Sequence, residues 1–311
     1  MALYIPQRDE DEGILHGVID MHCHAGPCIY GKDFDEIQTA EMMRAAGYRG
    51  VLFKQHVLGA NRIAFVRRAV PGIEIFGGVA LNHHVGGLNP FAVASCIIFG
   101  GKEVKFPNIH AAHHIKVFGT PTYAHIAPTG GASMEARMAK LVKGITIFDE
   151  AGKLVPIVHT ILDLIAEADI GVETGHLSKP ECAALIKAAR EHGIKRIWQT
   201  HGNWWKLYEY TPEELKALAE AGAFIELTAN FALYSSASNV SSAGAELTAA
   251  IVKAVGAERC VMASDYGTEG RYNPVEGMRV FIRTMLRLGI ARADIDKMAK
   301  RNPAYLLGLE G

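Results

Sequence analysis

Short apolar runs alternate with longer amphipathic segments along most of this 311-residue chain. The apolar runs are nearly continuous and rich in β-branched residues, which is typical of strands buried on both faces of a parallel sheet. We predict strands at residues 17–22, 49–54, 73–80, 102–106, 170–175, 196–200, 223–228 and 259–264. Eight strand–helix units predict an α/β fold, a closed (β/α)8 TIM barrel, with an open doubly wound sheet as the alternative.

The segments between the strands carry start and stop signals of helices. Capping boxes and terminal glycines predict three helices, from Asp33-x-x-Glu36 to Gly47, from Ser178-x-x-Glu181 to Gly193 and from Thr211-Pro-x-Glu214 to Gly222. Asn89-Pro90 is expected to start a further helix, because proline is favoured at the first helical position.

One connection is long, an insertion of about residues 107–155 between the fourth strand and a helix expected near 156–168. Its apolar segments 145–148 and 153–155 flank a turn and predict a hairpin. Leaving the C-terminal end of a strand, the insertion would cover that face as a lid or pack against another subunit. Residues 1–16, with an acidic run, are predicted to form an N-terminal surface arm, and residues 17–311 the barrel.

Composition narrows the class of protein. The net charge of -1 provides no field that would attract nucleic acid or an anionic membrane. The longest apolar run, residues 91–99, is too short to cross a bilayer, and no signal peptide precedes it. Five cysteines without paired spacing fit a reducing cytoplasm. We therefore expect a cytoplasmic protein that acts on a small molecule, with a homo-oligomer left open.

Residues of the types that bind metals follow four of the predicted strands. They are His22 and His24, then His176, then His201, then Asp265. Because a parallel barrel brings the C-terminal ends of its strands to one face, these side chains can converge on one divalent ion. Neutral imidazoles bind zinc, manganese, iron or nickel. The alternatives are core histidines and, for Asp265, a turn carboxylate.

With these residues in this order, the chain resembles the amidohydrolase superfamily of metal-dependent hydrolases. The resemblance implies that His22 and His24 hold one metal, and that His176 and His201 hold a second or polarise the substrate. It implies that Asp265 is both ligand and general base. One or two divalent ions are expected, zinc first. The chain is more closely similar to an uncharacterised branch of this superfamily, which offers no substrate that could be transferred to it. This closer similarity rests on Phe-Lys-Gln-His at 53–56, Thr-Gly-His-Leu-Ser at 174–178 and Asn-Pro-Ala-Tyr-Leu-Leu at 302–307.

The lysine of the site is the point where the chain departs from the family pattern. Many members with two metals carry a carbamylated lysine on the fourth strand, where this chain has Lys105. Lys54 ends the apolar second strand, where an unpaired ammonium would be costly. We predict Lys54 rather than Lys105 as the catalytic and metal-binding lysine. The alternative is a salt bridge from Lys54 to Asp20 or Glu173 inside the barrel.

Five further residues are predicted to contact the substrate, because each lies just beyond a predicted strand. They are His56, His83, Trp204, Glu269 and Arg271. Trp204 would wall an apolar pocket or simply pack its loop. Arg271 suits a carboxylate or phosphate, with a surface ion pair as the alternative.

The leading functional hypothesis is a hydrolase that uses an activated water to cleave a C–N or C–O bond of a small amide, cyclic amide, lactone or ester. A second hypothesis keeps the metal but makes the reaction a non-oxidative decarboxylation of an aromatic acid. A third is a non-catalytic, small-molecule-binding barrel, which fits poorly with a retained Asp265.

Overall fold

The structure, a computed structural model, describes residues 13–121, 137–233 and 244–309. Eight strands form one sheet in chain order, and each pairs in parallel with the next. They are β1 (Ile19–Cys23), β2 (Gly50–Phe53), β3 (Glu74–Ala80), β4 (Glu103–Lys105), β5 (Gly171–Glu173), β6 (Ile197–Gln199), β7 (Phe224–Thr228) and β8 (Cys260–Ala263). The predicted (β/α)8 barrel is confirmed, and each strand lies within two residues of its predicted bounds.

The last strand returns to the first and closes the barrel. The backbone N–H of His24 donates to the carbonyl of Tyr266 over 2.8 Å, and that of Asp265 donates to the carbonyl of His22 over 2.7 Å. The buried carboxylate of Asp20 accepts from the backbone N–H of Ser264 over 3.0 Å. The closure therefore places the segments that follow β1 and β8 directly against each other.

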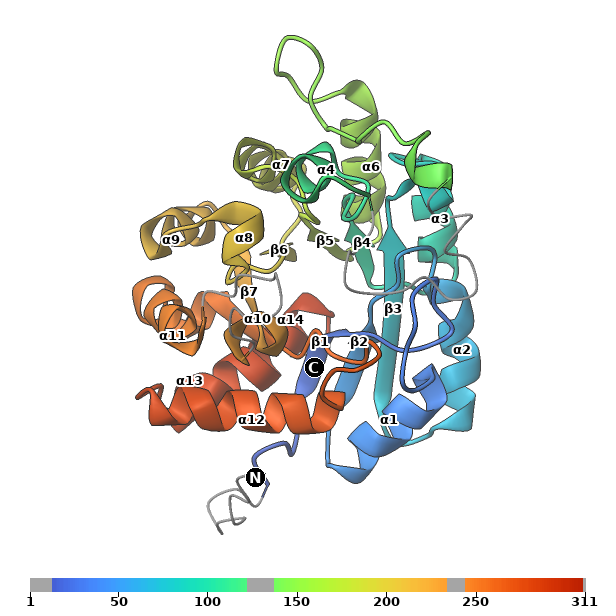
Figure 1. Cartoon of the computed structure of the whole chain (residues 1–311). Helices are drawn as coiled ribbons and strands as arrows, with labels where there is room; N and C mark the ends of the chain where they lie inside the picture. The colour runs from blue at the N-terminus through green and yellow to red at the C-terminus, as the bar shows by residue number, and fades with distance from the viewer. Residues whose placement is uncertain (1–12, 122–136, 234–243, 310–311) are drawn as a thin grey trace.

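Helices surround the strands on the outside (Figure 1). Those of the outer layer are α1 (Glu36–Ala45), α2 (Ala60–Ala69), α3 (Pro90–Ile98), α6 (Pro156–Glu167), α7 (Lys179–Glu191), α9 (Pro212–Glu220), α11 (Gly244–Val255) and α12 (Pro274–Arg287). Shorter helices are α4 (Ala112–Phe118), α8 (Trp205–Tyr208), α10 (Ala229–Leu233), α13 (Arg292–Asp296) and α14 (Asn302–Leu306).

Two of the predicted capping boxes, at Ser178 and at Thr211, are present. The prediction for α1 was wrong by two residues, because its capping box joins Asp35 and Gln38 rather than Asp33 and Glu36. A bridge between Gly26 and Asp35 holds the chain extended up to the helix, so Asp33 stays in the preceding loop.

The apolar core has two parts. The larger cluster fills the space between the strands and the outer helices. The smaller cluster includes Met21, Leu52 and Trp198 from the strands, and Leu306 and Leu307 from the C-terminal segment. The C-terminal helix α14 thus packs on the barrel strands and joins their apolar cluster. Burial of the strand residues on both sides explains why their sequences read as continuous apolar runs.

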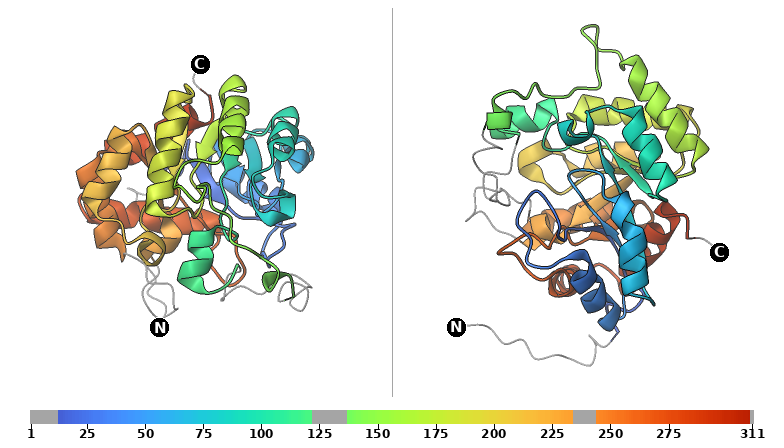
Figure 2. Two further views of the ribbon diagram at one scale, coloured as in Figure 1. Left: turned by 90° about the horizontal axis from the view of Figure 1, so that it is seen from above. Right: turned by 90° about the vertical axis from the view of Figure 1, so that its right-hand side faces the viewer.

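The long connection after β4 is present, and α4 forms its first helix. Figure 2 shows α4 at the end of the barrel opposite the C-terminus. The predicted hairpin is a single antiparallel bridge between Phe148 and Leu154, with a hydrogen bond from the N–H of Asp149 to the carbonyl of Lys153 (2.8 Å). Residues 122–136 of the insertion lie outside the described residues.

Of the predicted N-terminal arm, residues 1–12 also lie outside the described part. Within residues 13–16, Ile14 and Leu15 are buried in the larger core cluster. The domain boundary at residue 16 stays a prediction.

Candidate metal centre

His22 of β1, His24 just after that strand and the aspartate that follows β8 meet at one point. The Nε2 atoms of His22 and His24 lie 3.4 and 3.2 Å from Oδ1 of Asp265. All three residues are buried. Asp265 has a φ of 55°, a conformation that is rare for a residue with a side chain and that is often held at functional sites.

Hydrogen bonds on the far side of each ring fix which nitrogen faces Asp265. Nδ1 of His24 lies 3.0 Å from the carbonyl oxygen of Lys54, which can only accept, so Nδ1 carries the proton. Nδ1 of His22 lies 3.0 Å from Oε1 of Glu226. This is the outer-shell arrangement typical of metal-bound histidines, in which the second ring nitrogen is held by an acceptor.

The three atoms fit a divalent ion. Neutral His24 presents the Nε2 lone pair to an ionised carboxylate, which is repulsive unless a cation or a proton lies between them. Ligand atoms about 2.0–2.2 Å from a tetrahedral zinc ion are roughly 3.3–3.6 Å apart, close to the two separations observed here. Among the described residues, His22, His24 and Asp265 form one candidate ligand group, and His22, His201 and Glu226 form another.

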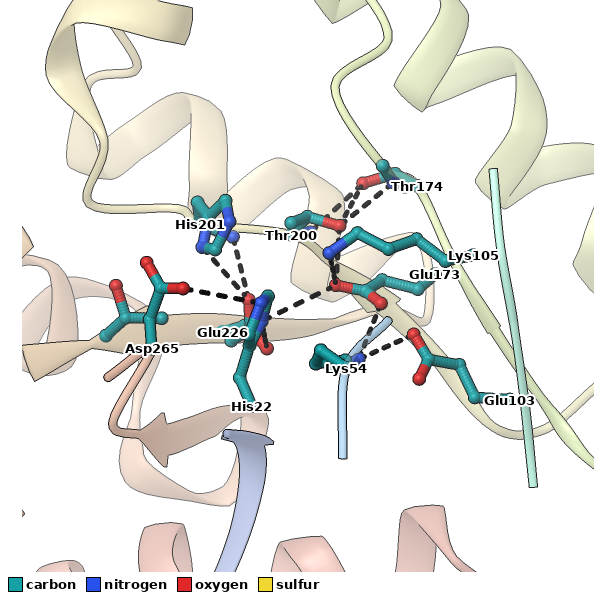
Figure 3. Close-up of polar contacts among 12 residues, drawn as sticks. His22, Lys54, Glu103, Lys105, Glu173, Thr174, Thr200, His201, Glu226 and Asp265 are labelled. Carbon is teal, nitrogen blue, oxygen red and sulfur yellow. Dashed lines mark hydrogen bonds and ion pairs between the residues drawn. The ribbon is translucent and has the colours of Figure 1, made fainter. Parts of the chain in front are cut away.

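His201 completes this cluster from the end of β6. Its ring centroid lies 4.7 Å from that of His22, and its backbone N–H donates to Oε2 of Glu226 over 3.1 Å. Like Asp265, His201 has a positive φ, 49°. Figure 3 shows His22, His201 and Asp265 gathered around Glu226, which comes from the middle of β7.

His176 lies beside His201, with ring centroids 5.5 Å apart, but it belongs to neither candidate ligand group. Its Nδ1 is 2.9 Å from Nδ1 of His114, which comes from α4 in the insertion. Its Nε2 is buried and has no hydrogen-bond partner among the described residues. Gly175 has a φ of 64°, and a Cβ there would lie 2.1 Å from the carbonyl oxygen of Phe106, so the turn into His176 requires glycine.

The charge states of the cluster suit cation binding. Burial would raise the pKa of Asp265, but His201, His24 and the amide of Asn230 lower it to about 2, so the carboxylate is ionised at neutral pH. Burial lowers the pKa values of His22, His24, His176 and His201, which keeps these rings neutral at pH 7. Burial and the charge of Glu173 raise the pKa of Glu226 to about 8, and a nearby cation would favour its ionised form.

Lys54 lies in a buried ion-pair network rather than among the histidines. Its Nζ is 2.5 Å from Oε1 of Glu103 and 2.6 Å from Oε2 of Glu173 (Figure 3). Burial alone would lower the pKa of Lys54, but these carboxylates raise it, so the amine stays charged. These contacts match the alternative role, a salt bridge inside the barrel. They speak against the interpretation of Lys54 as the metal-binding lysine, because carbamylation requires a neutral amine.

Lys105, at the end of β4, is the lysine nearer the histidines. Its Nζ lies 3.3 Å from Oε1 of Glu173, and its charge contributes to the lowered pKa values of His22, His176 and His201. Lys105 and Lys54 together hold the pKa of Glu173 well below its usual range, although burial would raise it. Lys54 thus has two carboxylate partners and Lys105 has one, and the choice of Lys54 as the metal-binding lysine stays a prediction.

The residues predicted to contact substrate differ in their burial and in their neighbours. His56 is buried, with its ring stacked on that of His24 at a centroid distance of 5.5 Å. His83 is exposed, and its Nε2 lies 2.8 Å from the carbonyl of Lys143. Glu269 is exposed and Arg271 is half-buried in the segment after β8.

Trp204 is 3% exposed and stacks on Phe231, with ring centroids 4.4 Å apart. The rings of His176 and His201 lie in T-shaped contact with the Trp204 ring, at centroid distances of 5.3 and 5.6 Å. This matches the packing alternative. Trp204 packs against the rings of both histidines and Phe231, and its contact with substrate stays a prediction.

Several residues of the site were missed in the sequence. Glu226 and Glu103 lie in apolar strands, where a charged residue was a usable signal, the same one that singled out Lys54. Asn230, whose amide donates to Oδ2 of Asp265 over 3.0 Å, and His114 left no such signal, because their positions depend on a short helix and on the insertion.

No helix within the described residues is long and apolar enough to cross a membrane.

Comparisons with known proteins agree with the fold. Residues 17–226 match the family described as "Family of unknown function (DUF6282)". No curated protein matches the sequence. An amidohydrolase from Pseudomonas aeruginosa is similar in structure, with a TM-score of 0.62 and 14% identity over 96% of this chain and 99% of the other.

Two further solved structures are similar. A metallopeptidase, dipeptidase AC, has a TM-score of 0.61 and 12% identity over 94% of this chain and 98% of its own. A dihydroxybenzoic acid decarboxylase from a Polaromonas species, with bound manganese and the inhibitor 2-nitroresorcinol, has a TM-score of 0.55 and 11% identity over 94% of this chain and 97% of its own. The resemblance to the amidohydrolase superfamily is thereby confirmed for the fold.

Proposed function

The chain belongs to the family of unknown function DUF6282, and we propose that it is a metal-dependent hydrolase of the amidohydrolase type. One observation carries the proposal: the lone-pair nitrogens of His22 and His24 face the ionised carboxylate of Asp265 at 3.4 and 3.2 Å. We propose that these three residues hold a divalent ion, with zinc first and manganese as the alternative. His201 and His176 are proposed to hold a second ion or to polarise the substrate.

The ion, when bound, would lower the pKa of a water molecule towards 7 and so make hydroxide available at neutral pH. Asp265 is proposed to accept the proton of that water, since its low pKa keeps it ionised. Asn230 holds the second oxygen of Asp265 and so fixes the direction of the carboxylate. The water oxygen would bond to the substrate carbonyl carbon, the C–N or C–O bond would break, and Asp265 would return the proton to the leaving atom.

Glu226 is proposed to position the histidines rather than to react. Its Oε1 lies 3.0 Å from Nδ1 of His22, and its Oε2 lies 3.3 Å from Nδ1 of His201 and accepts from the backbone N–H of His201, so it is placed to position both residues. Outer-shell partners of this kind raise the basicity of the ligand and typically change metal affinity by about 10- to 100-fold.

A metal-dependent decarboxylase is the second candidate, supported by the fold shared with a manganese-containing dihydroxybenzoic acid decarboxylase. The two reactions differ in their use of water. Hydrolysis in 18O-labelled water places the label in the acid that is formed, whereas decarboxylation leaves the aromatic product unlabelled and releases one carbon dioxide per turnover. A panel of lactones, amides, esters and aromatic acids, assayed for both outcomes, separates the candidates.

The ligand assignment is tested by metal analysis of purified protein together with turnover on that panel. His22→Ala is expected to lose metal and activity together, because a site of three or four protein ligands cannot spare one. His159→Ala, an exposed histidine on α6, is the matched control and should keep both. A His22→Ala protein that retains a full complement of metal would reject the assignment.

A further inference from the structure

Lys32 lies in the loop between β1 and α1, next to the metal centre, and is not used by the proposed mechanism. Its Nζ donates to Oγ1 of Thr268 over 2.9 Å, and the backbones of the two residues form a bridge. Thr268 is buried and follows Asp265 by three residues. Within the described parts of the chain, Lys32 makes no ion pair with a carboxylate.

Close contacts hold this lysine beside the ligands. A Cβ on Gly267 would lie 1.7 Å from the carbonyl oxygen of His24. The segment after β8 therefore packs directly against the backbone of His24. A Cβ on Gly26, two residues after His24, would lie 3.8 Å from Cβ of Lys32. The ammonium is near enough to lower the pKa of His24, after the larger effect of burial.

Lys32 differs from the fully buried lysines of the barrel interior, because it is half-buried and lacks a carboxylate partner among the described residues. The two lysines inside the barrel, Lys54 and Lys105, each have one or more carboxylates within ion-pair distance. Burial lowers the pKa of Lys32 from its usual value, because removing an ammonium from water costs free energy. Glu269 lies against Gly31, yet it does not pair with Lys32. The side chain of Lys32 is half-buried, and no carboxylate among the described residues forms an ion pair with it, so its ammonium is available to an anion that enters from solvent.

We propose that Lys32 is a specificity-determining residue that binds a carboxylate of the substrate, so that the substrates of this site are anionic small molecules. The inference rests on the proposed function, because it assumes that the substrate's reacting bond lies at the metal centre. One ammonium beside one hydroxyl provides few donors. A phosphate dianion prefers several convergent donors, and the nearby Asp265 would repel it, so the single charge of a carboxylate fits better.

The test uses the metal-loaded, full-length protein and matched pairs of acids and their amides, such as benzoate with benzamide and glutarate with glutaramide. Binding is measured by calorimetry and by the shift in melting temperature. The variants are Lys32→Met, which keeps the stem without the charge, and Lys32→Arg, which restores the charge. Lys153→Met, which removes an exposed lysine of the insertion, controls for net charge.

We expect at least one acid to bind the parent protein more tightly than its amide by about tenfold or more. Lys32→Met should abolish that preference, Lys32→Arg should restore part of it, and Lys153→Met should leave it unchanged. With a turned-over substrate, Lys32→Met should raise KM far more than it lowers kcat.

Two results would overturn the inference. One is that none of the acids is preferred over its amide by the parent protein. The other is that Lys32→Met binds acids as the parent does. Metal content is measured on the same samples: a parent protein without metal contradicts the proposed function, whereas metal-loaded protein without an acid preference contradicts only the role of Lys32.

Discussion

Replacing Lys54 by methionine separates a structural lysine from a catalytic one. The substitution keeps the length of the stem and removes the ammonium that contacts Glu103 at 2.5 Å and Glu173 at 2.6 Å. Glu173 keeps Lys105 as a partner, whereas Glu103, whose pKa burial raises well above its usual range, loses the ammonium that favours its ionised form. Breaking a buried pair from one side typically costs about 3–5 kcal/mol, because the remaining group is left buried without its partner.

This cost can be converted into a melting temperature. An unfolding entropy of about 2.1 cal/mol/K per residue gives about 0.65 kcal/mol/K for 311 residues. We therefore expect Lys54→Met to melt roughly 5–8 °C below the parent protein. Turnover per folded molecule and metal content should change little, since the amine lies in the ion-pair network and not at the ligand atoms.

Differential scanning calorimetry, metal analysis and turnover of the folded fraction, measured on the same samples, test this expectation. A second substitution, Glu103→Gln, removes the carboxyl group that has lost its partner and should restore part of the lost stability in the double variant. Lys153→Met serves as the exposed control and should melt like the parent. If Lys54→Met melts normally but loses several orders of magnitude in turnover, Lys54 acts on the substrate and the structural reasoning is refuted.

Three further expectations concern the centre itself. Asp265→Asn should keep at least part of the metal but lose about 100-fold or more in turnover, because an amide cannot accept the proton; normal turnover would place the base elsewhere. Glu226→Gln should weaken metal binding by about 10- to 100-fold in chelator competition, and an unchanged affinity would remove its positioning role. In chelator-treated protein, the free energy of unfolding should fall as the pH drops below about 6.5, by roughly 1.4 kcal/mol per pH unit for each buried histidine, because the unfolded chain takes up protons that the neutral folded rings do not. Denaturant titrations between pH 7 and 5 measure this slope, and a flat profile would show that the rings are not buried as neutral groups.

The order of strands and the positions of the ligand histidines were readable from the sequence for a local reason. A strand buried on both faces must be apolar throughout, so a polar residue at its end stands out. His22, His24, His176, His201 and Asp265 all stand at such ends, and the barrel rule places these ends on one face. The structure brings four of them together, with His22 shared between a group that holds His24 and Asp265 and a group that holds His201 and Glu226. His176 lies beside His201 and next to His114, outside both groups.

Which charges pair inside the barrel was decided by tertiary structure alone. Lys54 and Lys105 lie 51 positions apart in the sequence and both end apolar strands, so nothing local distinguishes their roles. Only the closed barrel brings Glu173 of β5 within ion-pair distance of both lysines, and brings Glu103, two residues before Lys105 on β4, to Lys54. An ion pair depends on a few ångströms of separation in space, whereas the apolar pattern of a strand depends on its immediate neighbours. The sequence by itself therefore determined the barrel and the face that carries the chemistry, and the packing of its interior determined which lysine is engaged there.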